Sequence, residues 1–76
     1  MRNKYQQLER HLDAAKRTRR KLAVEDFGDM FVARFWRGRG DDVEVWRGED
    51  ADLVTAINKA GDAYAIDMLA RHIFQE

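Results

Sequence analysis

The sequence predicts a small α+β domain in which an antiparallel hairpin packs on N-terminal and C-terminal helices, in the order α-β-β-α(-α). Apolar residues repeat at three- and four-residue steps at both ends of the chain, which is typical of amphipathic helices. Between these ends, apolar and polar residues alternate in two short runs around a glycine-containing turn, which indicates a β-hairpin. The length of 76 residues suits one domain, which we expect to cover residues 1–76.

The first predicted helix covers residues 3–23, with Asn3 as its N-cap. Its apolar stripe consists of Tyr5, Leu8, Leu12, Ala15 and Leu22. Arg19 occupies the one position of that stripe that is not apolar. Basic residues gather in the second half, where they suit the negative end of the helix dipole.

The predicted hairpin covers residues 29–47, with strands near 29–37 and 42–47. Its more uniformly apolar face is expected to form the core, and consists of Phe31, Ala33, Phe35, Val43 and Val45. The opposite face carries Met30, Val32, Arg34, Trp36, Glu44 and Trp46. Either the first helix covers this second face, which gives three layers, or the face is free for a partner.

The C-terminal segment, residues 51–75, is predicted as one kinked helix or as two helices that meet at Gly61 and Asp62, with a slight preference for two. Its first stripe consists of Leu53, Ile57, Ala60 and Tyr64. Its second consists of Ile66, Leu69, Ala70, Ile73 and Phe74. We expect the second stripe to pack on the hairpin.

The composition excludes several kinds of chemistry. The chain has no Cys and no Ser, so disulfides, thiolate metal sites and thiol or serine nucleophiles are excluded. Its acidic residues lack EF-hand spacing, and His11 and His72 lie far apart in the sequence. We therefore predict no catalytic, cofactor-binding or metal-binding residue, and no enzyme activity. Without a signal-peptide core or a run long enough for a membrane span, a cytoplasmic location is expected.

Two sets of residues are candidate contact sites. The hairpin set consists of Arg34, Trp36, Trp46 and Arg37, and Trp and Arg are the residue types that dominate binding hot spots. The basic set at the end of the first helix consists of Lys16, Arg17, Arg19, Arg20 and Lys21. A solvated helix end, a nucleic-acid contact and an acidic protein contact are all open for the basic set. The sequence pI of about 6.7 weighs against strong nucleic-acid binding.

These features favour a non-enzymatic protein–protein interaction module that binds another protein. In size and build the chain resembles the small accessory proteins of phages and mobile elements that bind and inhibit a host protein, such as anti-CRISPR and polymerase-inhibiting proteins. The alternative is a small dimeric nucleic-acid-binding protein that uses the basic end of the first helix. A homodimer is expected to be possible in either case, and a membrane partner is not expected.

The net charge of zero conceals an uneven distribution of charge. Residues 1–24 contain eight basic and two acidic residues, and the remainder contains six basic and twelve acidic residues. We expect the basic first helix and the acidic remainder to pair within the fold, to pair between copies, or to present surfaces of opposite sign to partners.

Overall fold

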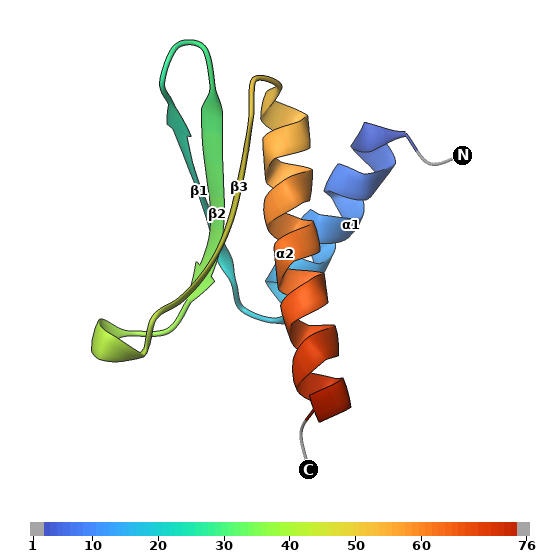
Figure 1. The fold of residues 1–76 in the computed structure, drawn as a ribbon, viewed down its shortest axis with the longest axis vertical. Coiled ribbons are helices and arrows are strands. Elements are labelled where there is room, and N and C mark those ends of the chain that lie inside the picture. The colour runs from blue at the N-terminus through green and yellow to red at the C-terminus, as the bar shows by residue number, and fades with distance from the viewer. Residues whose placement is uncertain (1–2, 75–76) are drawn as a thin grey trace.

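The computed structural model describes residues 3–74, and Figure 1 shows the arrangement of its elements. In chain order they are α1 (Lys4–Arg17), β1 (Lys21–Asp26), β2 (Phe31–Arg37), the 3₁₀ turn η1 (Gly40–Asp42), β3 (Glu44–Asp50) and α2 (Leu53–Phe74). The strands form one antiparallel sheet in the order β1-β2-β3, with both helices on the same face. The predicted α+β class is confirmed, but the order is α-β-β-β-α because the sheet has a third strand.

The first helix is shorter than predicted, because residues 18–23 do not continue it. Asn3 caps its start as expected, with its side-chain oxygen accepting from the backbone N–H of Tyr5 and Gln6. At its end, the N–H of Arg20 donates to the carbonyl of Ala15 over 2.8 Å, and Arg19 adopts a left-handed φ of 57°. This geometry is the Schellman motif, which ends a helix and turns the chain away.

The residues that follow form β1, whose Leu22 lies opposite Phe35 of the central strand. Leu22 had been assigned to the apolar stripe of the first helix, and that assignment is wrong. Side chains alternate between the two faces of a sheet, and Leu22 lies opposite Phe35, so its side chain is on the face that meets the helices. All six residues of β1 are exposed, because α1 touches this strand only weakly.

The expected core face is correct for β2 and wrong for β3. Ala33 and Phe35 are fully buried, as predicted, and Phe31 is half-buried. In the observed register, however, Trp46 lies opposite Phe35, so Trp46 faces the helices and is only 6% exposed. Val45 is 50% exposed on the other face, and Val43 precedes β3 and is also exposed. The predicted parity of the second strand is therefore inverted.

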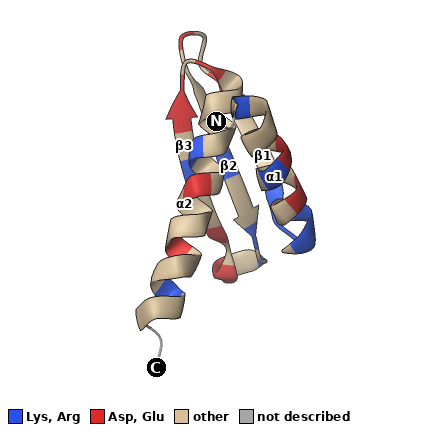
Figure 2. Cartoon of the chain, turned by 90° about the vertical axis from the view of Figure 1, so that its right-hand side faces the viewer, with Lys and Arg blue, Asp and Glu red and all other residues tan. Residues whose placement is uncertain are grey.

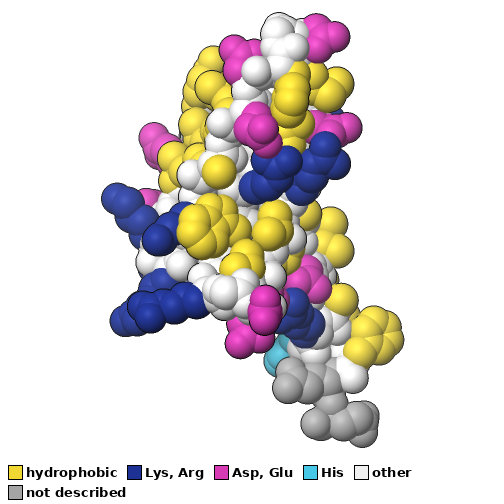
Figure 3. Space-filling model, turned by 90° about the vertical axis from the view of Figure 1, so that its left-hand side faces the viewer, with side chains coloured by type: hydrophobic (Ala, Val, Ile, Leu, Met, Phe, Trp, Pro, Cys, Tyr) yellow, Lys and Arg dark blue, Asp and Glu magenta, His cyan; other side chains and the backbone are white. Residues whose placement is uncertain are grey.

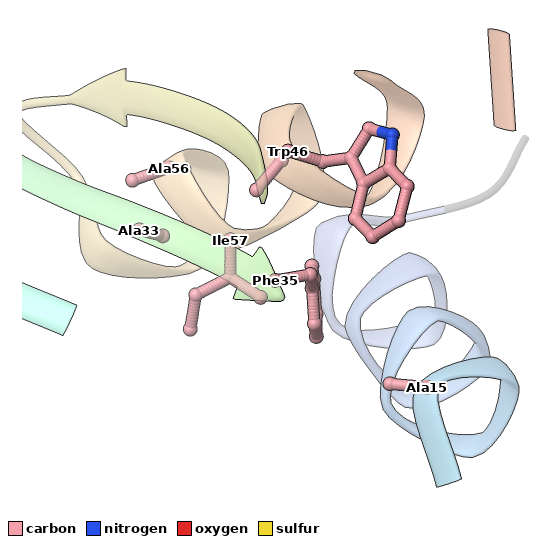
Figure 4. Packing of buried hydrophobic residues seen from close by; sticks show 7 residues of the cluster. Ala15, Ala33, Phe35, Trp46, Ala56 and Ile57 are labelled. Atoms are coloured by element: carbon pink, nitrogen blue, oxygen red, sulfur yellow. The ribbon is translucent and has the colours of Figure 1, made fainter. Parts of the chain in front are cut away.

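The core lies between β2, β3 and α2, and α1 closes one side of it. Figure 4 shows Phe35 and Ile57 at its centre, with Ala33 and Ala56 on one side of them and Trp46 and Ala15 on the other. Small residues bring α2 close to β3: a Cβ added to Gly48 would lie 2.4 Å from the backbone nitrogen of Ala60. Gly48 is therefore a strand residue that lets the helix approach.

The C-terminal segment is a single helix over the described residues, and the preference for two helices is wrong. Residue 75 of the predicted span lies outside the described residues. Gly61 is not a cap: a Cβ there would lie 2.3 Å from the Cγ of His11, so the missing side chain makes room for α1. At the other end, Asp52 caps the helix by accepting from the backbone N–H and the hydroxyl of Thr55.

Candidate functional site

Trp46, a predicted contact residue, belongs to the interior of the protein. Its indole N–H donates to the carboxylate of Asp67 over 2.8 Å, and its ring lies edge-on to Tyr64 with centroids 4.8 Å apart. The indole hydrogen bond, and then the charge of Arg71, lower the pKa of Asp67. With both contacts made and only 6% of the residue exposed, Trp46 offers little surface to a partner.

Arg20, a member of the predicted basic set, is also buried, with 6% exposure. Its guanidinium carbon lies 3.4 Å from the centroid of the Tyr64 ring, and its Nε–H donates to the Thr18 hydroxyl over 2.7 Å. Burial lowers the pKa of Arg20, and the neighbouring charge of Arg37 lowers it further. The aromatic stack holds this charge in place of a carboxylate, so Arg20 is a packing residue.

The face of the sheet opposite the helices is open, so the alternative in which the first helix covers it is wrong. Figure 3 looks onto this face, where hydrophobic side chains are interspersed with basic and acidic ones. Arg34 pairs with Glu25 of the neighbouring strand, and Arg47 pairs with Glu49 over 2.7 Å. Val32, between these pairs in the sheet, is only 3% exposed. Much of this face is therefore satisfied by contacts within the sheet, across strands for Arg34 and Glu25 and along β3 for Arg47 and Glu49.

The structure brings residues of both predicted sets together around one hollow of about 550 Å³. We call it the cationic hollow; it is lined by Arg19, Lys21, Trp36, Arg37, Gly38, Arg39 and Gly40. The amine of Lys21 lies 5.1 Å from the centroid of the Trp36 ring. Arg37 pairs with Glu44 over 3.5 Å. Within residues 3–74, the other three basic side chains of the hollow form no ion pair.

The backbone bends sharply around the cationic hollow. Three of its lining residues, Arg19, Gly38 and Gly40, have φ values of 57°, 111° and 58°. A Cβ on Gly38 would lie 2.1 Å from the backbone oxygen of Asp42, so only glycine fits there. Sequence reasoning missed Gly38, Arg39 and Gly40 as site residues. The Arg-Gly-Arg-Gly run after Trp36 was visible, but only the fold places it beside the end of α1.

The remaining basic residues, Lys16 and Arg17, stay on α1 and do not line the cationic hollow. Figure 2 shows basic segments gathered where α1 ends and turns into the sheet. Lys16 borders a second groove, of about 520 Å³, between α1 and β1. Leu12, Leu22 and Phe35 contribute apolar surface to that groove, and Glu9 and Asp13 also line it. The basic run of the sequence is thus divided: Lys16 lines the groove, Arg20 lies in the interior, and Arg19 and Lys21 line the cationic hollow.

The C-terminal half of α2 carries a second unusual surface. Ile66, Leu69, Ile73 and Phe74 are 67%, 58%, 62% and 81% exposed, although the second stripe was expected to pack on the hairpin. That expectation is wrong because the sheet contacts the side of α2 formed by the small residues Ala56 and Ala60. We call the exposed set of Ile66, Leu69 and Ile73 the outer face of α2. The helix carries it past the end of α1, as Figures 1 and 2 show.

The charged side chains on this half of α2 contact residues of the sheet. Over residues 63–74 the Asp, Glu, Lys and Arg residues are Asp67 and Arg71 alone. Asp67 accepts from Trp46 and pairs with Arg71, and Arg71 also pairs with Glu44 of β3. The outer face itself is therefore aliphatic and without an ionised carboxylate, lysine or arginine.

The described part of the chain shows no grouping of three or more His, Asp and Glu side chains suited to a metal ion. Neither helix of residues 3–74 combines the length and the apolar run that a membrane crossing requires. Comparison of the chain with protein-family models, with curated proteins and with solved structures finds no match.

Proposed function

We propose that this chain is a non-enzymatic protein–protein interaction module that associates through the outer face of α2. The observation that carries the proposal is the exposure of Ile66, Leu69 and Ile73, each more than half exposed on a protein whose core is small. The helix α2 is apolar on the side that meets the sheet and also on the outer face. A helix that is apolar on all sides is normally buried, so the outer face is expected to be covered by another surface. Contiguous apolar surface of this kind marks a protein contact.

The occupant that this face fits is the same face of a second copy. Ile66 lies three residues before Leu69 and Ile73 four residues after it, so the three side chains share one side of the helix. Antiparallel pairing of two such helices about Leu69 places Leu69 against its own counterpart and Ile66 against Ile73. A two-fold interface needs this self-complementarity, and two-fold dimers are the commonest oligomers.

Charge also favours an apolar partner over a charged one. The outer face has no Asp, Glu, Lys or Arg, and the two such residues between positions 63 and 74, Asp67 and Arg71, are engaged by Trp46 and Glu44. A strongly charged partner surface would lose hydration there without gaining an ion pair. A helix surface that is also uncharged loses no hydration of charged groups on binding, so α2 of a second copy is the matching surface.

The test is the mass in solution, measured by light scattering across a range of protein concentrations. We expect the wild-type chain to be a dimer and Leu69→Lys to be a monomer with an unchanged far-ultraviolet circular dichroism spectrum. Phe27→Lys is the matched control, because Phe27 is 59% exposed in the β1–β2 turn, away from α2, and this variant should remain dimeric. A monomeric wild type, or a dimeric Leu69→Lys, contradicts the proposal.

The idea that the module also blocks a host protein in the cytoplasm, as its size and build led us to expect, stays a prediction. In that case the dimer contact and the host contact would use different surfaces. The open sheet face and the cationic hollow are the surfaces left free by pairing through α2.

A further inference from the structure

We infer that the cationic hollow is a nucleotide-binding site, in which an aromatic base stacks beside Trp36 and phosphate oxygens are held by Arg19 and Arg39. The same chemistry is presented by a free nucleotide and by a unit of a single strand, and the experiment below separates the two. This inference does not depend on association through α2, because the hollow and the outer face of α2 share no residue.

The strongest support is the backbone of Arg19. A left-handed conformation costs an L-residue free energy that glycine avoids, and glycine is the usual residue at this position of a Schellman motif. Arg19 holds this position with a φ of 57°, and within residues 3–74 its side chain makes no ion pair. No ion pair of the Arg19 side chain therefore offsets the free-energy cost of its backbone conformation. This points to a role of the side chain in binding a ligand.

The second support is the composition of the lining. Arg19 and Lys21 come from the end of α1 and the start of β1, whereas Arg39 follows Gly38 in the β2–β3 connection. All three line the same hollow as the half-buried indole of Trp36, over whose ring the Lys21 amine lies 5.1 Å from the centroid. Cations set around an aromatic platform are the combination that binds single-stranded nucleic acid, where bases stack and phosphates are neutralised.

The size of the hollow and the presence of the indole select the ligand class. The volume of about 550 Å³ lies within the range of small-molecule sites. An acidic peptide would need the cations but not the aromatic ring at their centre. A nucleotide uses both, and guanidinium groups match the geometry of phosphate oxygens.

The experiment titrates the full chain with four probes and follows tryptophan fluorescence. The probes are adenosine diphosphate, a twelve-residue oligothymidylate, inorganic phosphate and a glutamate-rich peptide. We expect the first two to quench the fluorescence of Trp36, with the tighter one identifying the free nucleotide or the strand as the source. Trp36→Phe should remove the signal, because the other tryptophan, Trp46, is buried in the core. Absence of quenching by both, or equal binding of the peptide by titration calorimetry, overturns the inference.

Variants and salt provide an independent readout. Trp36→Ala should weaken binding measured by calorimetry by roughly tenfold or more, the effect expected for loss of one stacked base. For the oligothymidylate, three unpaired cations predict a slope of log K against log salt of about −2, and Arg19→Gly should make it shallower by about 0.7. Arg10→Gln removes one exposed charge elsewhere on α1 and should leave the affinity unchanged. Equal affinity and slope for wild type and Arg19→Gly would refute the site.

Discussion

At the scale of single residues, the fold depends on positions where the ordinary residue preference is reversed. Arg19 is an L-residue in a glycine conformation, while Gly48 and Gly61 are glycines without a left-handed backbone. The two glycines are needed for space, because added Cβ atoms would meet the backbone of α2 and the ring of His11 respectively. Sequence alone placed Gly61 where two helices were expected to meet, since close approach between distant segments leaves no local signal.

The first prediction concerns the stability cost of Arg19. Arg19→Gly should raise the free energy of unfolding by about 0.5–1 kcal/mol, because relief of the left-handed strain exceeds the extra chain entropy of glycine in the unfolded state. Arg17→Gly is the control: Arg17 is helical, so it should lower the free energy of unfolding by up to about 1 kcal/mol. Denaturant titration measures both, and a loss of stability in Arg19→Gly would show that its side chain supports the fold.

The second prediction uses the contact between Gly61 and His11. Gly61→Ala should lower the free energy of unfolding by about 1–3 kcal/mol, because the new methyl group displaces the imidazole and breaks its 3.1 Å contact with Asp62. In a His11→Ala background the same change should instead raise stability by roughly 0.5–1 kcal/mol, since alanine is the better helix residue. A double-mutant cycle by denaturant titration checks this reversal of sign, and additive effects would contradict it.

At the scale of elements, the residue pattern identified both helices and the antiparallel pairing of β2 with β3, but it missed β1 and the face to which the residues of β3 point. Leu22 continues the spacing of the α1 stripe, so the helix pattern extends over residues that in fact form β1. In the predicted second strand both parities carry apolar residues, Val43 and Val45 on one and Trp46 on the other, so alternation alone could not choose. The choice is made in three dimensions, where Gly48 on the parity of Trp46 lets α2 approach.

Contacts between segments distant in the sequence also decided which candidate contact residues are buried. Trp36 was correctly placed on the sheet face opposite the core, whereas Arg19, expected within the stripe of the first helix, lies beyond the end of α1. Trp46 and Arg20 were misplaced because their burial depends on Tyr64, a residue of α2 distant in sequence. The apolar stripe of Ile66, Leu69 and Ile73 was recognised, but nothing local indicated that α2 would extend it beyond the sheet.

The third prediction tests the parity of β3. Trp46→Ala should lower the free energy of unfolding by about 3–5 kcal/mol, which approaches the whole stability of a domain this small. Val45→Ala should change it by less than about 0.5 kcal/mol, because Val45 is half exposed on the open face. Thermal and denaturant unfolding measure both variants. A larger loss of stability in Val45→Ala than in Trp46→Ala would contradict the observed parity and support the one predicted from the sequence, with Val45 in the core.

At the scale of the whole molecule, the division of charge along the chain is only partly resolved within the fold. The amine of Lys4 pairs with Asp52, and His11 contacts Asp62, each over 3.1 Å, so the first half of α1 joins the acidic C-terminal segment. At the other end of α1, Lys16, Arg17 and Arg19 form no ion pair within residues 3–74. These three unpaired cations therefore lie close together in the sequence where α1 ends, and Arg19 among them lines the cationic hollow.

The carboxylates that do have partners make the fold sensitive to acid. The pKa of Asp52 is lowered first by the hydroxyl and N–H of Thr55, and that of Asp67 first by the indole of Trp46. Arg71 lowers the pKa of Glu44, and the backbone N–H of Asp52, followed by Lys59, lowers that of Asp50. Each group has a lower pKa folded than unfolded, so it stabilises the fold above its ordinary pKa and loses that effect as pH falls.

The fourth prediction is therefore a melting temperature that is nearly constant from pH 7 to about 5 and falls below about pH 4, where these carboxylates take up protons. Asp67→Asn should lower the melting temperature at pH 7 and flatten the acid decline, because one of the groups that link protons to folding is gone. Asp29→Asn, at an exposed turn position, should follow the wild-type profile. Differential scanning calorimetry from pH 7 to 2 measures all three, and a wild type that becomes more stable below pH 4 would show that these ion pairs and caps do not contribute to folding.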